Sequence, residues 1–541
     1  MLNLSLEPTD DRANPLFRDA SSCAKWLAQL QLTNMQLAHS HLLTQINELN
    51  RYPMPGLERL NTLEQLRETV GYVQDQYSGK LASKPLPLNE SELMVLFAVV
   101  QLWHALVSGY QRCLQDYMAG DRKLAKHAAL LCQRCLLYSG LEIFEHLRVG
   151  YEFDAKLWQQ LHGLYAFAEE RGFHSAEVAD PLNSEQPRSS CQGVYARVLL
   201  ACHARPAELS RAQLHLLDAW LTQWSGTVTI DRNCTPGTTE AQPLALDMSS
   251  AHGLWPVKLI QHSDSMRYLE VSQLSKLLRA KIALLQQGKT PQQSDLGSQG
   301  NSRDCIDFLK FLHQCWCEEH SRFGERPPIT LEAHLCSGIE DVYAQLTGRR
   351  FKPFGRDAGI NRKASEQIEV FGRVLQGDRN DRNDRNEQKF QMENWHLENG
   401  SILGARLTRK DTIGGRLSYD QLVAVRPDSA ETFTLGATAW ARVTRAGQLQ
   451  IGVRFLPGAA KAISICATGI NATTMDKYAP ALLLQAVPAL KMPHSLIIPR
   501  NWFQRGRVIE VTLPGSGPQL AKMGLSVERG IDFERVSFTL L

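Results

Sequence analysis

The chain has 541 residues, which is too long for one hydrophobic core and predicts about three or four domains. Its 43% hydrophobic and 21% charged residues are typical of globular proteins and exclude global disorder. The 59 Lys and Arg nearly balance the 56 Asp and Glu, for a net charge of +3. The chain therefore lacks the overall basic field that attracts nucleic acids or acidic membranes, and a local cluster must bind any anion.

The first residues, MLNLSLEPTDDR, contain neither the basic nor the apolar region of a secretory signal. The 12 cysteines are irregularly spaced and do not form a disulfide framework. We therefore expect a cytoplasmic protein with reduced, buried cysteines. Cys132 and Cys135 have C-x-x-C spacing, but they lie in an apolar helical stretch with no second pair, so core packing is favoured over metal binding.

Residues 1–185 have the pattern of a helical domain. Met35, Ala38, Leu42, Ile46 and Leu49 follow one another at spacings of three and four, which places them on one face of a helix. Similar apolar faces recur over residues 121–148 and 155–172, which predicts an antiparallel helical bundle or array.

Residues 93–111, LMVLFAVVQLWHALVSGYQ, contain no charged side chain. Their length is close to the roughly 20 residues of a membrane span. However, His104 lies within the stretch, and Asn89 with Glu92 forms a pattern that caps soluble helices. We favour a buried core helix over membrane insertion.

The middle of the chain is mixed. Over residues 190–286 we expect helices near 214–224 and 274–285 and strands near 226–230 and 244–248, without a recognisable fold. Residues 287–303 are rich in Gln, Ser and Gly and predict a flexible connector.

After residue 320 the pattern alternates. Ile329, Leu331, Ala333 and Leu335 occupy one face of a half-buried strand. Further strand-like runs span residues 368–375, 389–397, 405–408, 421–426, 433–445 and 449–455. We predict a small antiparallel β-barrel over residues 304–460, including the helix that leads into it, and a second β unit over 461–541. The whole chain is thus expected to be a multidomain α+β protein.

Two arginines precede the first barrel strand. Arg322 and Arg326 lie four residues apart in the sequence SRFGER. A guanidinium group can donate two hydrogen bonds to a phosphate or to a guanine edge, and it can stack on a base. Arginines at this spacing are also common on solvated helix faces, so the pair alone is weak evidence.

A second motif lies in the sequence ENGSILGARL. Asn399, Ser401 and Gly404 fit the pattern Asn, x, Ser, x, x, Gly. Asn offers a donor and an acceptor, Ser offers a hydroxyl, and Gly lets the backbone approach a flat ligand or another chain segment closely. On its own the motif is also compatible with an ordinary turn capped by its own side chains.

In this order the two motifs resemble the signature of the PilZ domain, a bacterial receptor module for cyclic di-GMP. The resemblance covers about residues 320–460, and Gly452 matches a further position of the family. It implies that Arg322, Arg326, Asn399, Ser401 and Gly404 bind cyclic di-GMP. The arginines would hold the phosphates and guanine faces, and the Asn/Ser/Gly turn would receive a guanine edge. The N-terminal helical region resembles no family that we recognise.

The two motif halves are unusually far apart, since 399 minus 326 is 73 positions. Two insertions account for the distance: a short helix predicted over residues 338–348 and an inserted loop over 376–388. The loop contains the charged triplet repeat DRNDRNDRN, which should be solvated. If the pairing of motifs is wrong, Arg349, Arg350 and Arg356 form the nearest alternative basic cluster.

The resemblance implies a cyclic di-GMP effector that relays the signal to a protein partner through its helical region, in control of motility, pili or biofilm. We expect no enzyme, because the sequence lacks nucleophile-elbow, Walker and H-E-x-x-H motifs. We also expect no cofactor, no metal, no DNA or RNA partner and no membrane insertion. The alternative is a scaffold protein with a PilZ-like barrel that does not bind nucleotide.

Overall fold

The computed structural model describes the chain except for residues 1, 3, 5, 184–185, 235–240, 258–262, 299, 319–327, 352–391, 412, 469–477 and 514–516. The described residues form two compact units. The first contains residues 1–84 and 88–324, and the second contains residues 85–87 and 325–541. The first unit is mainly helical and the second contains two β-barrels, which confirms the multidomain α+β class.

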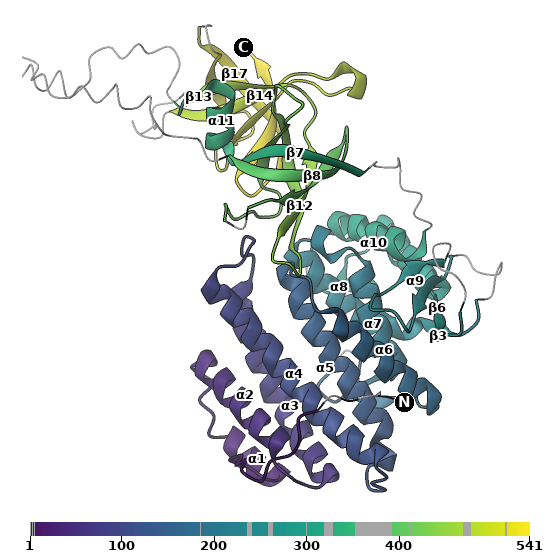
Figure 1. Ribbon diagram of the computed structural model, residues 1–541. Coiled ribbons are helices and arrows are strands. Elements are labelled where there is room, and N and C mark those ends of the chain that lie inside the picture. Colours follow the sequence, from purple (N-terminus) through teal and green to yellow (C-terminus); the bar gives the residue numbers. More distant parts are fainter. Residues whose placement is uncertain are drawn as a thin grey trace, which may run out of the picture. The chain divides into compact units, whose positions relative to one another are not determined.

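The helices of the first unit form an array in which neighbours along the chain pack together (Figure 1). α4 packs against α2, α3 and α5, and α5 packs against α6 and α7. The helices are α1 (Ala20–Leu27), α2 (Met35–Arg51), α3 (Gly56–Ser78), α4 (Glu90–Met118), α5 (Ala128–Val149), α6 (Ala155–Glu170), α7 (Cys191–His203), α8 (Arg211–Trp224), α9 (Ser272–Gln286) and α10 (Ser302–Cys317).

The apolar helix α4 begins at the predicted cap. The Asn89 side chain accepts a hydrogen bond from the backbone N–H of Glu92 at 2.9 Å, and the Glu92 carboxylate accepts one from the backbone N–H of Asn89 at 2.9 Å. Its length and composition would also suit a membrane span. Here the helix packs in the array, with Val99 fully buried and Phe97 53% exposed.

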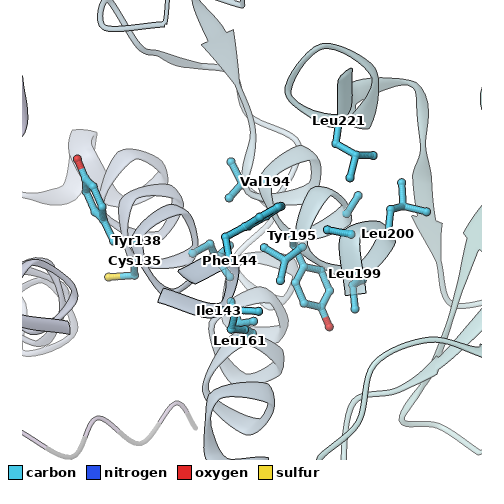
Figure 2. Close-up of a cluster of buried hydrophobic side chains, with 14 of the residues drawn as sticks. Cys135, Tyr138, Ile143, Phe144, Leu161, Val194, Tyr195, Leu199, Leu200 and Leu221 are labelled. Carbon is cyan, nitrogen blue, oxygen red and sulfur yellow. The ribbon is translucent and has the colours of Figure 1, made fainter. Parts of the chain in front are cut away.

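One hydrophobic core continues through the whole first unit. Figure 2 shows part of it, with Cys135, Tyr138, Ile143 and Phe144 of α5, Leu161 of α6, Val194, Tyr195, Leu199 and Leu200 of α7, and Leu221 of α8. The rings of Tyr165 and Tyr195 stack with centroids 4.5 Å apart. The same core includes Leu244 and Phe308, so residues 190–286 share it with the helices, while Ala245, Met266 and Tyr268 form a small cluster of their own.

Within this middle segment, four short strands form an antiparallel sheet in the order β3-β6-β4-β5. They are β3 (Thr229–Asp231), β4 (Leu244–Asp247), β5 (Trp255–Pro256) and β6 (Met266–Glu270). A separate pair is formed by β1 (Val178–Ala179) and β2 (Arg188–Ser189). The predicted helices near residues 214–224 and 274–285 are confirmed as α8 and α9.

Part of the stretch expected to be a flexible connector, residues 287–303, is packed against the helical core. Leu296 is 1% exposed, and its carbonyl accepts a hydrogen bond from the Trp220 indole at 3.1 Å. The expectation was wrong because composition predicts low intrinsic order, whereas burial of Leu296 against the helical core holds the segment in place.

The second unit contains two closed antiparallel barrels. The first consists of β7 (Pro328–Ser337), β8 (Glu393–Ser401), β9 (Gly404–Arg409), β10 (Leu422–Pro427), β11 (Thr434–Val443) and β12 (Leu449–Phe455). The second consists of β13 (Ala460–Ala467), β14 (Tyr478–Leu484), β15 (Ser495–Pro499), β16 (Val508–Thr512), β17 (Gln519–Arg529) and β18 (Phe533–Leu540). The closed orders are β7-β8-β9-β12-β11-β10 and β13-β14-β15-β18-β17-β16, so both barrels have the same topology.

The burial predicted for the first barrel strand is confirmed at two positions and wrong at one, and the side chain of the fourth, Ile329, lies outside the described residues. Ala333 and Leu335 on β7 are each 1% exposed, but Leu331 is 41% exposed. The ladder between β7 and β8 shifts register between Pro328 and Leu331. From Leu331 to Leu335 the pairing with β8 is regular, so Leu331 lies on the same face as Ala333 and Leu335, but it is the residue next to the irregularity and is less covered.

The helix predicted over residues 338–348 is confirmed as α11 (Ile339–Thr347). It lies in the connection between β7 and β8, yet it packs on β13 and β14 of the second barrel. Val342 and Tyr343 share a core with Leu422 of the first barrel and Leu482 of the second. The inserted helix therefore joins the two barrels. The strand predicted over 368–375 and the inserted loop over 376–388 lie outside the described residues.

Candidate functional site

The Asn/Ser/Gly motif forms the tight hairpin between β8 and β9. Ser401 pairs with Gly404 across a turn made of Ile402 and Leu403. The Ser401 hydroxyl accepts a hydrogen bond from the backbone N–H of Leu403 and donates one to the carbonyl of Gly404, both at 3.3 Å. Ser401 therefore stabilises its own turn, and the adjacent Ile402 is 93% exposed.

Gly404 is needed for the approach of two strands. A Cβ at this position would lie 2.3 Å from the backbone carbonyl oxygen of Val453 on β12. The sequence left open whether Gly404 allows close approach of a ligand or of another chain segment. The structure shows the second, the close approach of β12.

Asn399 offers an unused acceptor. Its Oδ1 atom is buried and has no hydrogen-bond partner among the described residues. The register between β8 and β9 shifts between Leu397 and Asn399, which leaves Glu398 as an extra residue opposite β9. Bulges of this kind re-aim side chains and are common at binding sites. A buried acceptor without a partner is costly unless a ligand or another group supplies a donor.

The arginine half of the signature, Arg322 and Arg326, lies outside the described residues. The strand that follows it is described, however, and Pro328 pairs directly with Asn399. Arg326 precedes Pro328 by two positions in the sequence. Pairing of β7 with β8 places Asn399 opposite Pro328, the residue two positions after Arg326 in the sequence.

A polar network that sequence reasoning missed covers the face beside Asn399. The Arg406 Nε lies 2.8 Å from a Glu398 carboxylate oxygen, and Gln450 donates to the other oxygen at 2.9 Å. Arg406 and Arg442 both donate to the Gln450 side-chain carbonyl, at 3.2 and 2.8 Å. Among the described residues, this network joins the guanidinium groups of Arg406 and Arg442 to the carboxylate of Glu398 through Gln450. Alternation of polar residues in β9, β11 and β12 was the only sequence signal for it.

The alternative basic cluster is less suited to this site. Arg349 and Arg350 follow α11, which begins after Ser337, at the opposite end of β7 from Pro328. Arg356 lies outside the described residues. The strand direction therefore favours the segment before Pro328 as the one next to Asn399.

The cysteines that were weighed as metal ligands lie in the core. Cys132 donates a hydrogen bond to the carbonyl of Leu164 at 3.3 Å, and burial raises the pKa of the Cys135 thiol well above its usual value. A neutral buried thiol is a poor metal ligand, because metals bind the thiolate. Within the described part of the chain, no group of three or more His, Cys, Asp or Glu side chains is placed to hold a metal.

Comparison with known families relates both ends of the chain to one class of protein, receptors for cyclic di-GMP. Residues 21–236 match the family model described as "Cyclic-di-GMP receptor FimW, N-terminal domain". Residues 465–541 match "FimW C-terminal beta-barrel domain". The helical region, for which the sequence had suggested no family, is therefore similar to a recognised one, which corrects that expectation.

One relative is similar along nearly its whole length. The protein named "Cyclic-di-GMP receptor FimW" from Pseudomonas aeruginosa is 23% identical over 554 aligned positions, which include 95% of this chain and 90% of the relative. The alignment is long enough to include both units and both barrels.

Proposed function

We propose that this protein is a non-enzymatic effector that binds cyclic di-GMP on the first barrel, beside the hairpin between β8 and β9. One observation carries the proposal: Pro328 pairs with Asn399, so the chain that bears Arg322 and Arg326 leads directly to the Asn399 side chain. The similarity to a cyclic di-GMP receptor supports the choice of ligand.

The proposal divides the five signature residues into two roles. Arg322 and Arg326 would hold phosphates and guanine faces, because guanidinium groups form bidentate, charge-assisted hydrogen bonds and also stack. Asn399 would meet a guanine edge through its free Oδ1 acceptor. Ser401 and Gly404 shape the hairpin that presents Asn399.

Isothermal titration with cyclic di-GMP tests the site. Arg322→Ala or Arg326→Ala should cost on the order of 2 to 5 kcal/mol of binding free energy, since each change removes a charge-assisted contact and leaves a phosphate unpaired. Arg349→Ala and Arg350→Ala are the matched controls and should bind like the wild type. Equal affinity in all four variants would overturn the site assignment.

The protein partner would be reached through the helical unit. α10 directly precedes the arginine segment, so ordering of that segment on the ligand should alter α10 and any equilibrium in which α10 takes part. Hydrogen exchange with and without cyclic di-GMP measures this. Increased protection in α10 supports a relay. Changes confined to residues 320–460 would leave simple recruitment of the barrel as the mode of action.

A second candidate function is a scaffold whose first barrel binds no nucleotide. The observation that favours it is that Ser401 and Gly404 both have structural uses within their own hairpin. The same titration separates the two candidates, because a scaffold would show no binding heat with the wild-type protein and no ligand-dependent rise in melting temperature.

A further inference from the structure

Trp440 of β11 lies on the surface of the first barrel, over a position of the neighbouring strand that has no side chain. It pairs with Gly452 of β12. A Cβ on Gly452 would lie 2.1, 2.4 and 2.7 Å from the Nε1, Cε2 and Cδ1 atoms of the indole. Because three ring atoms are this close to the position that a side chain would occupy, the indole lies flat across the strand. One face of the ring is therefore covered by the barrel backbone, and the other faces outward.

The outward face of Trp440 is accessible. The side chain is half-buried, and its indole N–H makes no hydrogen bond among the described residues. By contrast, Trp316 and Trp395 donate to Leu200 and Glu393, at 3.0 and 3.2 Å. The Arg442 guanidinium carbon lies over the Trp440 ring, 5.8 Å from its centre. A flat aromatic ring with a cation close by suits a base that carries a phosphate.

The ring belongs to the same cross-strand row as Asn399. Asn399 pairs with Arg406, Arg406 with Gly452, and Gly452 with Trp440. At about 4.8 Å per strand, the Cα atoms of Asn399 and Trp440 are roughly 14 Å apart, and the indole extends back over Gly452 toward Arg406. The row therefore presents an amide acceptor, a guanidinium group and an aromatic face in order.

We propose that Trp440 is the stacking platform for one purine of the bound cyclic dinucleotide, and that Gly452 is the positioning residue that lets the indole lie flat. The inference rests on the proposed function and adds a specificity-determining residue outside the five-residue signature. Stacking recognises the flat face of a purine, while hydrogen bonds at Asn399 would distinguish guanine from adenine.

Titration of the full-length chain with cyclic di-GMP tests the platform. Trp440→Met keeps an apolar group over Gly452 but removes the aromatic face, and it should weaken binding roughly 5- to 150-fold. Trp440→Phe restores an aromatic face and should bind within a few-fold of the wild type. The matched control is Trp502→Leu on the second barrel, where a half-buried tryptophan also lies beside an arginine, with the Arg507 guanidinium 5.5 Å from its ring.

The outcomes separate this inference from the proposed function. Wild-type affinity in Trp440→Met, or equal weakening in Trp440→Met and Trp440→Phe, would overturn the stacking role while leaving cyclic di-GMP binding intact. Absence of binding by the wild type would overturn both proposals. If Trp440→Met does not fold, quenching of tryptophan fluorescence by cyclic di-GMP decides: a stacked Trp440 predicts quenching in the wild type that is lost in Trp440→Phe. Cyclic di-AMP is the third arm, and binding as tight as that of cyclic di-GMP would contradict guanine selection at Asn399.

Discussion

The variant Gly404→Ala tests whether this glycine serves the close packing of β9 on β12 or the close approach of a ligand. The new Cβ would lie 2.3 Å from the Val453 carbonyl oxygen, whereas ordinary contacts begin at 3.4 Å, so β9 and β12 would have to separate by about 1 Å. Overpacking of this kind costs about 1 to 3 kcal/mol. For a unit of this size, each kcal/mol lowers the melting temperature by about 2–4 °C, which gives a loss of roughly 2–12 °C.

Thermal unfolding without ligand is the assay, and Gly400→Ala is the control. A Cβ on Gly400 would have only a side-chain atom of Leu397 nearby, at 3.9 Å, so that variant should melt like the wild type. We expect Gly404→Ala to unfold earlier even in the absence of nucleotide. The reasoning is refuted if Gly404→Ala keeps the wild-type melting temperature but loses cyclic di-GMP, because the glycine would then serve close approach of the ligand.

Two further predictions concern the inserted loop and a buried histidine. Deletion of residues 378–386 should leave melting temperature and affinity for cyclic di-GMP nearly unchanged, since a solvated charged repeat contributes no core; a folded variant that no longer binds would show that the loop takes part in the site. Burial lowers the pKa of His162 from 6.5 to about 4, so the unfolded chain binds a proton first as the pH falls. Stability present above pH 6.5 should therefore be lost progressively down to pH 4, by up to about 3 kcal/mol. Urea unfolding at several pH values should show a flatter dependence in His162→Gln, and an unchanged slope would contradict this assignment.

Local patterns in the sequence determined the elements. Asn89 and Glu92 cap α4 as predicted because a capping box involves residues only three positions apart. Apolar spacing located α2, and alternation located most strands of the first barrel, because both depend on neighbours within one element. The same alternation did not predict the exposure of Leu331, which lies next to a register shift that depends on the partner strand.

The pairing of distant segments was decided only by the tertiary structure. The sequence supplied the five signature residues, but it could not show that Pro328 pairs with Asn399 across the long insertion. Nor could it show that the second β unit repeats the topology of the first barrel, or that Trp440 lies over Gly452. Strand register is set by packing and hydrogen bonding between residues far apart in the chain. Residue types and local periods therefore located the signature residues, and closure of the barrel placed Asn399 opposite Pro328 and Trp440 over Gly452.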